Sequence, residues 1–254
     1  MSAAGLGIIA FLCVVVGMVA GLLLRNSLPD HHLSGDSRDA VKMGAGLIAT
    51  LSALVLGLLI SSAKDSFDAM NHAITESSAK LIMLDRILAQ YGPQTQVIRN
   101  QLRHSVIEVV ALVWPEQKTD KDTMSTFEES PATMELVAAR IRELSPQNDT
   151  QKVFQSEAIG ICRDLLQTRW LVIERAQLSL PMAFIVVLLF WLTMLFGTFG
   201  VLAPANKTAV AALAVCAISV GGAIFLIEEM NRPLGGMVKV SSAPILKAIE
   251  HLGK

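Results

Sequence analysis

The stretch MGAGLIATLSALVLGLLISSA, from Met43 to Ala63, runs for twenty-one residues without a charged side chain. About 20 apolar residues, each rising roughly 1.5 Å along a helix, are enough to cross the hydrocarbon core of a bilayer. Lys64 then opens an amphipathic stretch that contains neither proline nor glycine before Gly92. The sequence therefore predicts one helix that spans a membrane and continues well beyond it.

Two patterns within this predicted helix are typical of helix packing. Inside the apolar run, small residues recur every four positions, which favours close contact with a neighbouring helix or leaves room for a narrow pathway: Ala45, Ala49, Ala53, Gly57 and Ser61. Beyond Lys64, spacings of three and four alternate in a stripe with the heptad pattern of coiled coils: Phe67, Met70, Ile74, Ser77, Leu81, Leu84, Leu88 and Tyr91. Both patterns favour self-assembly through this helix.

Three further uncharged stretches, at about 3–24, 178–202 and 208–227, are long enough to span a bilayer. The chain of 254 residues has a mean hydropathy of +0.52 although 17% of its residues are charged, which indicates alternating membrane and aqueous segments. The first stretch lacks the basic flank of a signal peptide, so we expect it to be retained. It also contains the helix-packing spacing GxxxG, from Gly17 to Gly21.

These segments predict an all-α membrane protein with four transmembrane helices and a cytoplasmic helical domain formed by extensions of spans two and three. The expected parts are spans one and two, the cytoplasmic domain, spans three and four, and a cytoplasmic C-terminal segment, at 1–63, 64–177, 178–228 and 229–254. Of the 21 Lys and Arg residues, the two short connections contain Arg25, Arg38, Lys42 and Lys207. The positive-inside rule then places both termini and the long segment in the cytoplasm.

Side chains that could carry chemistry are sparse. The densest group combines Asp30, His31 and His32 with Asp36 and Asp39. Adjacent histidines point in different directions and no third ligand has a recognised spacing, so a hydrogen-bonded, pH-responsive loop is favoured over a metal site. Catalytic and nucleotide-binding motifs are missing, the three cysteines form no CxxC pair, and a net charge of −1 gives no general attraction to nucleic acid. We therefore expect no enzyme, cofactor, metal or nucleic-acid partner.

Two blocks of sequence resemble the bestrophin-like family of bacterial membrane proteins. They are HHLSGDSRDAVKMGAGLIATLSALVLGLLISSAKDSFD and, after the last span, EEMNRPLGGMVKVSSAPILKAI. More loosely, the chain is similar to the bestrophins themselves, which are anion channels with four spans, cytoplasmic termini and a pore lined by span two. The resemblance implies a multi-pass protein of the bacterial inner membrane that conducts small inorganic anions.

The segment after span four extends this resemblance. In bestrophins an acidic residue precedes Asn-Pro-Phe-Gly at this place, and the residues that correspond here are Glu228, Glu229, Asn231, Pro233 and Gly235. Arg232 interrupts the motif and Leu234 replaces phenylalanine. The acidic run that follows in calcium-gated bestrophins is replaced by GMVKV, which argues against calcium activation. Span two also lacks the bulky aromatic residues of the bestrophin pore neck.

Two functions follow from these observations. The first is an oligomeric ion channel for anions, in which span two lines a narrow aliphatic pore. We expect its pore-lining residues to be Thr50, Ala53, Gly57 and Ile60, with Lys42 and Lys64 near the two mouths. The alternative is a non-conducting membrane scaffold or sensor that assembles through the extension of helix two. The channel, the preferred function, predicts a homo-oligomer in contact with membrane lipid.

Overall fold

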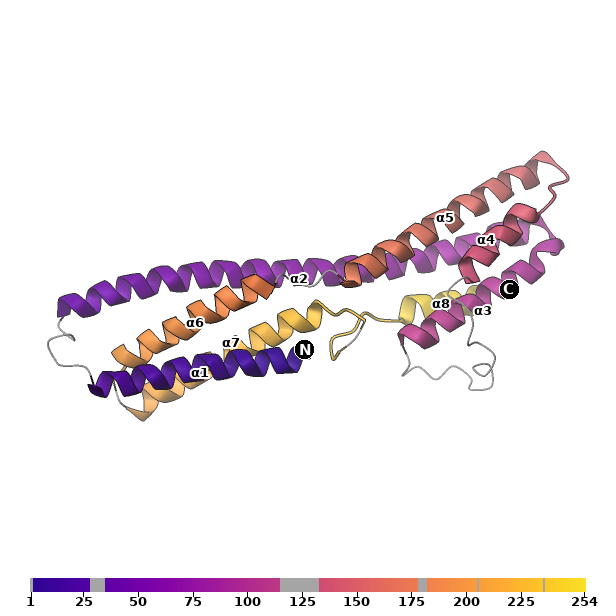
Figure 1. Cartoon of the computed structure of the whole chain (residues 1–254). Helices are drawn as coiled ribbons and strands as arrows, with labels where there is room; N and C mark the ends of the chain where they lie inside the picture. Colours follow the sequence, from indigo (N-terminus) through magenta and orange to yellow (C-terminus); the bar gives the residue numbers. More distant parts are fainter. Residues whose placement is uncertain (1, 28–34, 115–132, 178–181, 205, 235) are drawn as a thin grey trace. The chain divides into compact units, whose positions relative to one another are not determined.

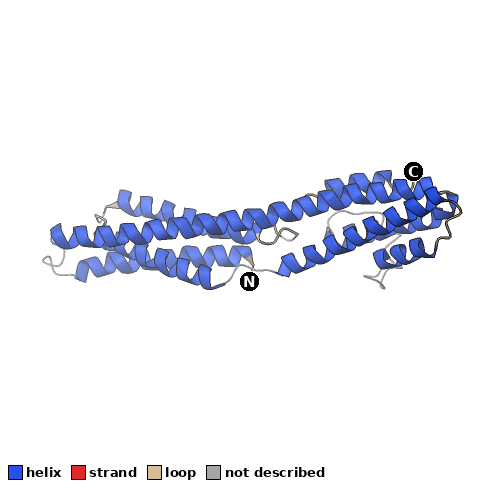
Figure 2. Cartoon of the chain, turned by 90° about the horizontal axis from the view of Figure 1, so that it is seen from above, coloured by secondary structure: helices blue, strands red, loops and turns tan. Residues whose placement is uncertain are grey.

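The computed structural model describes residues 2–27, 35–114, 133–177, 182–204, 206–234 and 236–254, and the regular secondary structure within these ranges is helical (Figure 2). The chain divides into two compact units (Figure 1). The first, which we name the membrane unit, comprises Met1–Phe67 and Ser179–Val238. The second, which we name the extramembrane unit, comprises Asp68–Leu178 and Lys239–Lys254.

Four described helices are long and apolar enough to cross a membrane, which confirms an all-α fold with four candidate spans. They are α1 (Ala3–Ser27), α2 (Gly35–Tyr91), α6 (Met182–Leu202) and α7 (Lys207–Met230). α2 is one helix of 57 residues and contributes to both units. It stops before Gly92, as predicted, and Gly92 has a φ of +138°, a backbone conformation that favours glycine.

α1 packs against both α6 and α7, and glycines allow these contacts (Figure 1). A Cβ atom on Gly17 or Gly21 would collide with the main chain of α6, in the second case at Gly197. On the other side of α1, Gly221 of α7 faces Phe11 closely. The GxxxG spacing of the first span is therefore a site of close helix packing, as predicted.

Polar contacts fix the ends of two spans. Arg25 in the last turn of α1 donates a hydrogen bond to the main-chain carbonyl of Ala203, just after α6. Asn206 caps α7, because its Oδ1 atom accepts a hydrogen bond of 2.8 Å from the main-chain N–H of Ala209. These contacts hold neighbouring helix ends where the chain passes from α6 to α7.

The extramembrane unit contains the second part of α2 together with η2 (Pro93–Thr95), α3 (Gln96–Val113), α4 (Thr133–Glu143), α5 (Asp149–Gln177) and α8 (Ala243–His251). Pro93 opens the turn after α2, where its missing N–H is not needed. α4 packs against α3 and α5, and Lys80 of α2 forms an ion pair of 3.2 Å with Asp164 of α5. Residues 115–132, between α3 and α4, lie outside the described residues.

Most of the heptad stripe of α2 is buried within this unit, whereas Ile74 and Ser77 are only partly buried. Its members at the far end of the helix are almost fully covered by their own chain: Leu81, Leu84, Leu88 and Tyr91. Met70, nearer the membrane unit, is buried as well. These buried side chains therefore supply the core of the extramembrane unit and are not available for a coiled coil with another copy.

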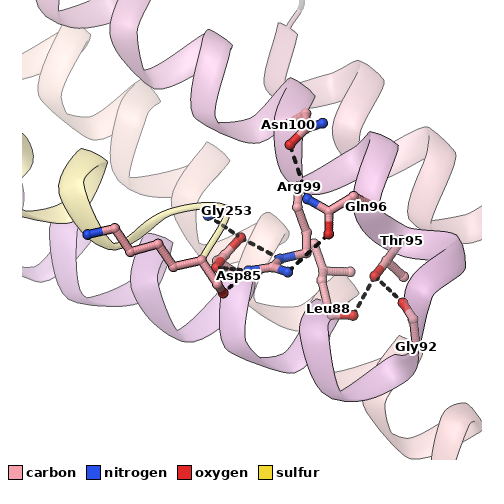
Figure 3. Close-up of polar contacts among 9 residues, drawn as sticks. Asp85, Leu88, Gly92, Thr95, Gln96, Arg99, Asn100 and Gly253 are labelled. Carbon is pink, nitrogen blue, oxygen red and sulfur yellow. Dashed lines mark hydrogen bonds and ion pairs between the residues drawn. The ribbon is translucent and has the colours of Figure 1, made fainter.

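The last segment of the chain completes the same core. The indole N–H of Trp114 donates a hydrogen bond of 3.0 Å to the carbonyl of Val240, and α8 packs against α3. Near the end of the chain, Gly253 donates its main-chain N–H to Asp85, which also binds Arg99 (Figure 3). Residues separated by half to two thirds of the sequence thus share one interior.

Candidate functional site

Within the membrane unit, α2 presents three different faces. The face that packs into its own subunit consists of the buried residues Ala45, Ser52, Leu59 and Ala63. The second, which we name the small face, consists of the exposed residues Thr50, Ala53, Gly57 and Ile60. The third, which we name the leucine ridge, consists of the exposed residues Met43, Leu47, Leu51, Leu54 and Leu58. At about 100° per residue, the centres of the three faces lie roughly 100–145° apart around the helix axis.

The small face contains all four side chains that the sequence predicts to line a pore. Gly57 has no neighbour within 4 Å of the position that a Cβ atom would occupy. The hydroxyl of Thr50 donates a hydrogen bond of 2.9 Å to the carbonyl of Gly46 one turn earlier, so its proton is bound within the helix. The face is consequently uncharged, mostly low in profile apart from Ile60, and not covered by the rest of the chain.

Both lysines that were predicted near the pore mouths lie on the line of the small face. Lys42 precedes Thr50 by eight residues and Lys64 follows Ile60 by four, spacings that keep one side of a helix. Lys42 forms an exposed ion pair of 3.2 Å with Asp39. Because exposed pairs of this kind contribute about 1 kcal/mol or less, the ammonium group of Lys42 remains an accessible positive charge.

The leucine ridge was not predicted as a surface of its own. Its spacings of four, four, three and four can be read from the sequence, but in an apolar span they do not distinguish a core face from an exposed one. In the structure, Leu47, Leu54 and Leu58 each keep about 60% or more of their side chains exposed. A ridge of this kind fits lipid or another protein surface, not water.

The predicted C-terminal motif forms a compact turn at the end of α7. The Glu229 carboxylate accepts main-chain hydrogen bonds from Met237 at 2.7 Å and from Val238 at 3.3 Å. Directly before these two residues, Gly236 has a φ of +116°, and a Cβ atom there would collide with the same carboxylate. Glu229 therefore holds the chain that leaves span four in this turn.

The remaining motif residues support the same turn. Glu228 is largely buried and pairs with Arg232 one turn later, at 2.8 Å between Nη2 and Oε1. Asn231 is the C-cap of α7, and Pro233 is buried. Gly235 lies outside the described residues. Arg232, which interrupts the family motif, thus neutralises the charge of Glu228 at the end of the helix.

Groups that could hold a metal are absent from the part of the chain that the structure describes, since no cluster of three or more His, Cys, Asp or Glu side chains occurs there. The predicted loop with Asp30, His31 and His32 lies outside these residues. All three cysteines are described and form no disulfide. Burial raises the pKa of the Cys162 thiol to about 11, so this group is protonated at neutral pH and poorly nucleophilic.

Comparisons with known proteins agree with this architecture. The sequence profile of the Bestrophin-like domain matches residues 11–245. A crystal structure of a membrane protein is similar with a TM-score of 0.66 and 12% identity, over 95% of this chain and 96% of that one. A bacterial bestrophin homologue from Klebsiella pneumoniae, solved as a point mutant, is similar with a TM-score of 0.65 and 15% identity, over 96% of both chains. A search of curated proteins returned no match.

Proposed function

The chain belongs to the Bestrophin-like family, and from this premise we propose that it is a subunit of an oligomeric membrane channel for small inorganic anions. In this proposal the small face of α2 lines the pore. Thr50, Ala53, Gly57 and Ile60 form a narrow aliphatic wall, and Lys42 and Lys64 lie at its two ends.

The observation that carries the proposal is that the small face is uncharged and exposed. An uncharged strip of mostly small side chains, exposed along a membrane span, has no packing role within its own subunit. Arranged around a central axis, several copies of it form a hydrophobic constriction, which passes ions when wetted and blocks them when dry. A lysine at each end raises the local concentration of anions over cations.

The orientation of the chain in the membrane is part of the same proposal. Lys64 and Arg232 lie close to one end of the spans, on the side of the long segment and the termini, and the short connections hold few basic residues. The positive-inside rule therefore favours cytoplasmic termini in a bacterial inner membrane. Reporter fusions at both termini, one active only in the cytoplasm and one only outside it, test this placement directly.

Ion conduction is tested with purified oligomers in planar bilayers and in liposomes. We expect a chloride current whose reversal potential follows the chloride gradient. In a background without native cysteines, Thr50→Cys and Gly57→Cys are expected to lose current on treatment with a charged, water-soluble thiol reagent, because their side chains face a wet pore. Phe190→Cys is the matched control: Phe190 is also exposed, on α6, but lies on a bulky apolar face that we assign to lipid.

Two results would contradict the proposal. Intact oligomers that carry no anion current at any voltage or pH tested would leave the scaffold as the better function. Equal modification of Phe190→Cys and Gly57→Cys would show that the small face does not line a water-filled path. The scaffold that assembles through the extension of α2 has less support, because most of the heptad stripe, including all its members from Leu81 to Tyr91, is buried within its own subunit.

A further inference from the structure

A groove runs between α1 and α7 on the surface of the membrane unit. Its volume is about 380 Å³, and its lining is almost wholly apolar. Gly7 and Gly222 form low points, and larger side chains flank them, among them Ile8, Phe11, Ile218 and Phe225. No heavy atom lies within 4 Å of a Cβ atom placed on Gly222, so the subunit itself does not fill this space.

We infer that the leucine ridge of α2 in one subunit docks into the groove between α1 and α7 of the adjacent subunit. The inference rests on the oligomer in the proposed function, but not on ion conduction. It names the interface that holds neighbouring copies together. Three observations carry it: the level of the two surfaces, their charges, and the order of faces around α2.

The first observation is the level of the two surfaces in the membrane unit. Leu6, Leu59 and Ile227 line one small void, so α1, α2 and α7 are at the same height at these residues. α2 and α7 run in one direction and α1 in the other. At about 1.5 Å per residue, Ile8 is then level with position 57 of α2, and Gly222 with position 54. Subunits related by an axis along the membrane normal keep their levels, so the groove meets Leu54 and Leu58 of a neighbour.

The second observation is the charge that borders each surface. Asp65 lies seven residues beyond Leu58, on the line of the leucine ridge, and is exposed. On the groove side, the row that contains Ile218, Gly222 and Phe225 continues through Glu229 to Arg232.

The two border charges lie at nearly equal height and have opposite sign. Arg232 follows Ile227 by five residues, and Asp65 follows Leu59 by six. The Arg232 side chain, although paired with Glu228, is 47% exposed, and its five N–H donors can serve a second carboxylate. Docking of the ridge therefore brings Asp65 toward Arg232 of the adjacent copy.

The third observation is the order of faces around α2. One side packs into its own subunit, the small face turns toward the proposed axis, and the leucine ridge lies on the remaining side. Each α2 is thereby placed between its own bundle and that of its neighbour. Ridge and groove are different surfaces, so the contact is heterologous, and such contacts close into rings when the rotation permits.

Disulfide trapping tests the contact in native membranes. The three native cysteines are first replaced by serine, and Leu58→Cys is combined with Ile8→Cys, which lies at nearly the same level. A mild oxidant is expected to link neighbouring copies through disulfides. Non-reducing gels should then show a ladder of dimers, trimers and higher species. Each single variant is expected to stay monomeric on the gel. The control pair, Leu58→Cys with Phe190→Cys, is expected to give no ladder.

Blocking the groove supplies an independent readout. Gly222→Leu places a side chain in the groove, and its Cβ atom meets no heavy atom of another helix within 4 Å, so we expect the subunit to fold and the oligomer to dissociate. Gly160→Leu is the matched control, because Gly160 on α5 has equally open surroundings but lies in the extramembrane unit. Mass measurement in detergent, together with the thermal midpoint of each variant, separates dissociation from unfolding.

The possible results discriminate between the two proposals. A ladder from the double variant and dissociation by Gly222→Leu support the interface. Oligomers that survive Gly222→Leu, or a ladder from Leu58→Cys alone, would overturn it while the channel proposal stands. Lipid that is released by Gly222→Leu from an intact oligomer would assign the groove to an acyl chain instead. A parent protein that is monomeric in native membranes would overturn the oligomer itself.

Discussion

The carboxylate of Asp85 and the guanidinium of Arg99 face each other in the interior of the extramembrane unit, joined by two hydrogen bonds of 2.8 Å (Figure 3). Their side chains are 1% and 8% exposed. Arg99 also donates to the main-chain oxygen of Lys254, and Gly253 donates to Asp85. The bonds to Asp85 raise the pKa of Arg99, which stays charged. The pair thus fastens the end of the chain to α2 and α3.

Removing one partner of this pair is expected to be costly. Asp85→Ala leaves a buried guanidinium without its counter-ion, and we expect the free energy of unfolding to fall by about 3–5 kcal/mol. Asp149→Ala breaks an exposed pair of the same 2.8 Å length, with Lys152, and is expected to change stability by less than about 1 kcal/mol. Denaturant unfolding in mixed micelles compares the two variants. Equal losses would show that burial does not set the energy of the Asp85 pair.

The packing of α1 on α6 predicts a large effect of a single methyl group. In Gly21→Ala the new Cβ atom meets the main chain of Gly197, and we expect destabilisation of about 1–3 kcal/mol from overpacking. Gly57→Ala adds the same group where nothing lies within 4 Å, and it is expected to be neutral or to stabilise by up to about 1 kcal/mol. Thermal midpoints in detergent measure both. A stable Gly21→Ala protein would contradict the close packing.

Two buried serines on α2 differ in their hydrogen bonds. The Ser52 hydroxyl has no partner among the described residues, whereas the Ser78 hydroxyl donates to the carbonyl of Ile74 at 2.7 Å. Ser52→Ala removes an unsatisfied polar group and is expected to stabilise by about 1 kcal/mol, while Ser78→Ala is expected to destabilise by a similar amount. The opposite order in unfolding experiments would contradict the unsatisfied state of the Ser52 hydroxyl.

The raised pKa of Cys162 predicts both its reactivity and its effect on stability. With the pKa near 11 in the folded protein, alkylation at pH 8 is expected to be slow and to accelerate on unfolding. Between pH 9 and 11 the unfolded thiol loses its proton before the folded one, so ionisation lowers stability as pH rises. Stability of the parent is therefore expected to fall more steeply over this range than that of Cys162→Ala. If the stability of both proteins fell equally steeply with pH, the raised pKa of Cys162 would be refuted.

The turn after α7 depends on Glu229 more than on its neighbour Glu228. In Glu229→Ala the main-chain N–H groups of Met237 and Val238 lose their acceptor, and we expect their hydrogen exchange to accelerate at least tenfold. Glu228→Ala is the control, because its carboxylate binds the Arg232 side chain and not these amides. Hydrogen exchange is measured by mass spectrometry on peptides that cover 236–240. Equal exchange rates in the two variants would contradict the role of Glu229 in this turn.

Much of the fold could be predicted because its signals are local. The uncharged run from Met43 to Ala63 and the breaker at Gly92 were enough to predict one continuous α2. The use of the heptad stripe was harder to predict, because periodicity gives a buried face but does not say which chain buries it. Leu84 and Leu88 turn out to be covered by their own subunit.

Long-range polar contacts could not be predicted at all. Asp85 lies off the heptad stripe and resembles a solvent-exposed helix residue, and only the fold brings Arg99 and Gly253 to it. At the candidate site, the small face was predicted residue by residue from spacing and family resemblance, and its role stays a prediction. The groove between α1 and α7 was missed, since it is formed by glycines on two spans that are far apart in sequence.

The interleaved make-up of the extramembrane unit has a consequence for biosynthesis. Asp85 and Arg99 leave the ribosome early, but the residues that cover them, up to Lys254, follow only after α6 and α7 have been made. The two hydrophobic segments have to enter the bilayer in between. This interior can therefore close only after α6 and α7 have been inserted into the membrane. A chain that stalls before this point leaves Asp85, Arg99 and the apolar residues around them exposed to proteases and chaperones.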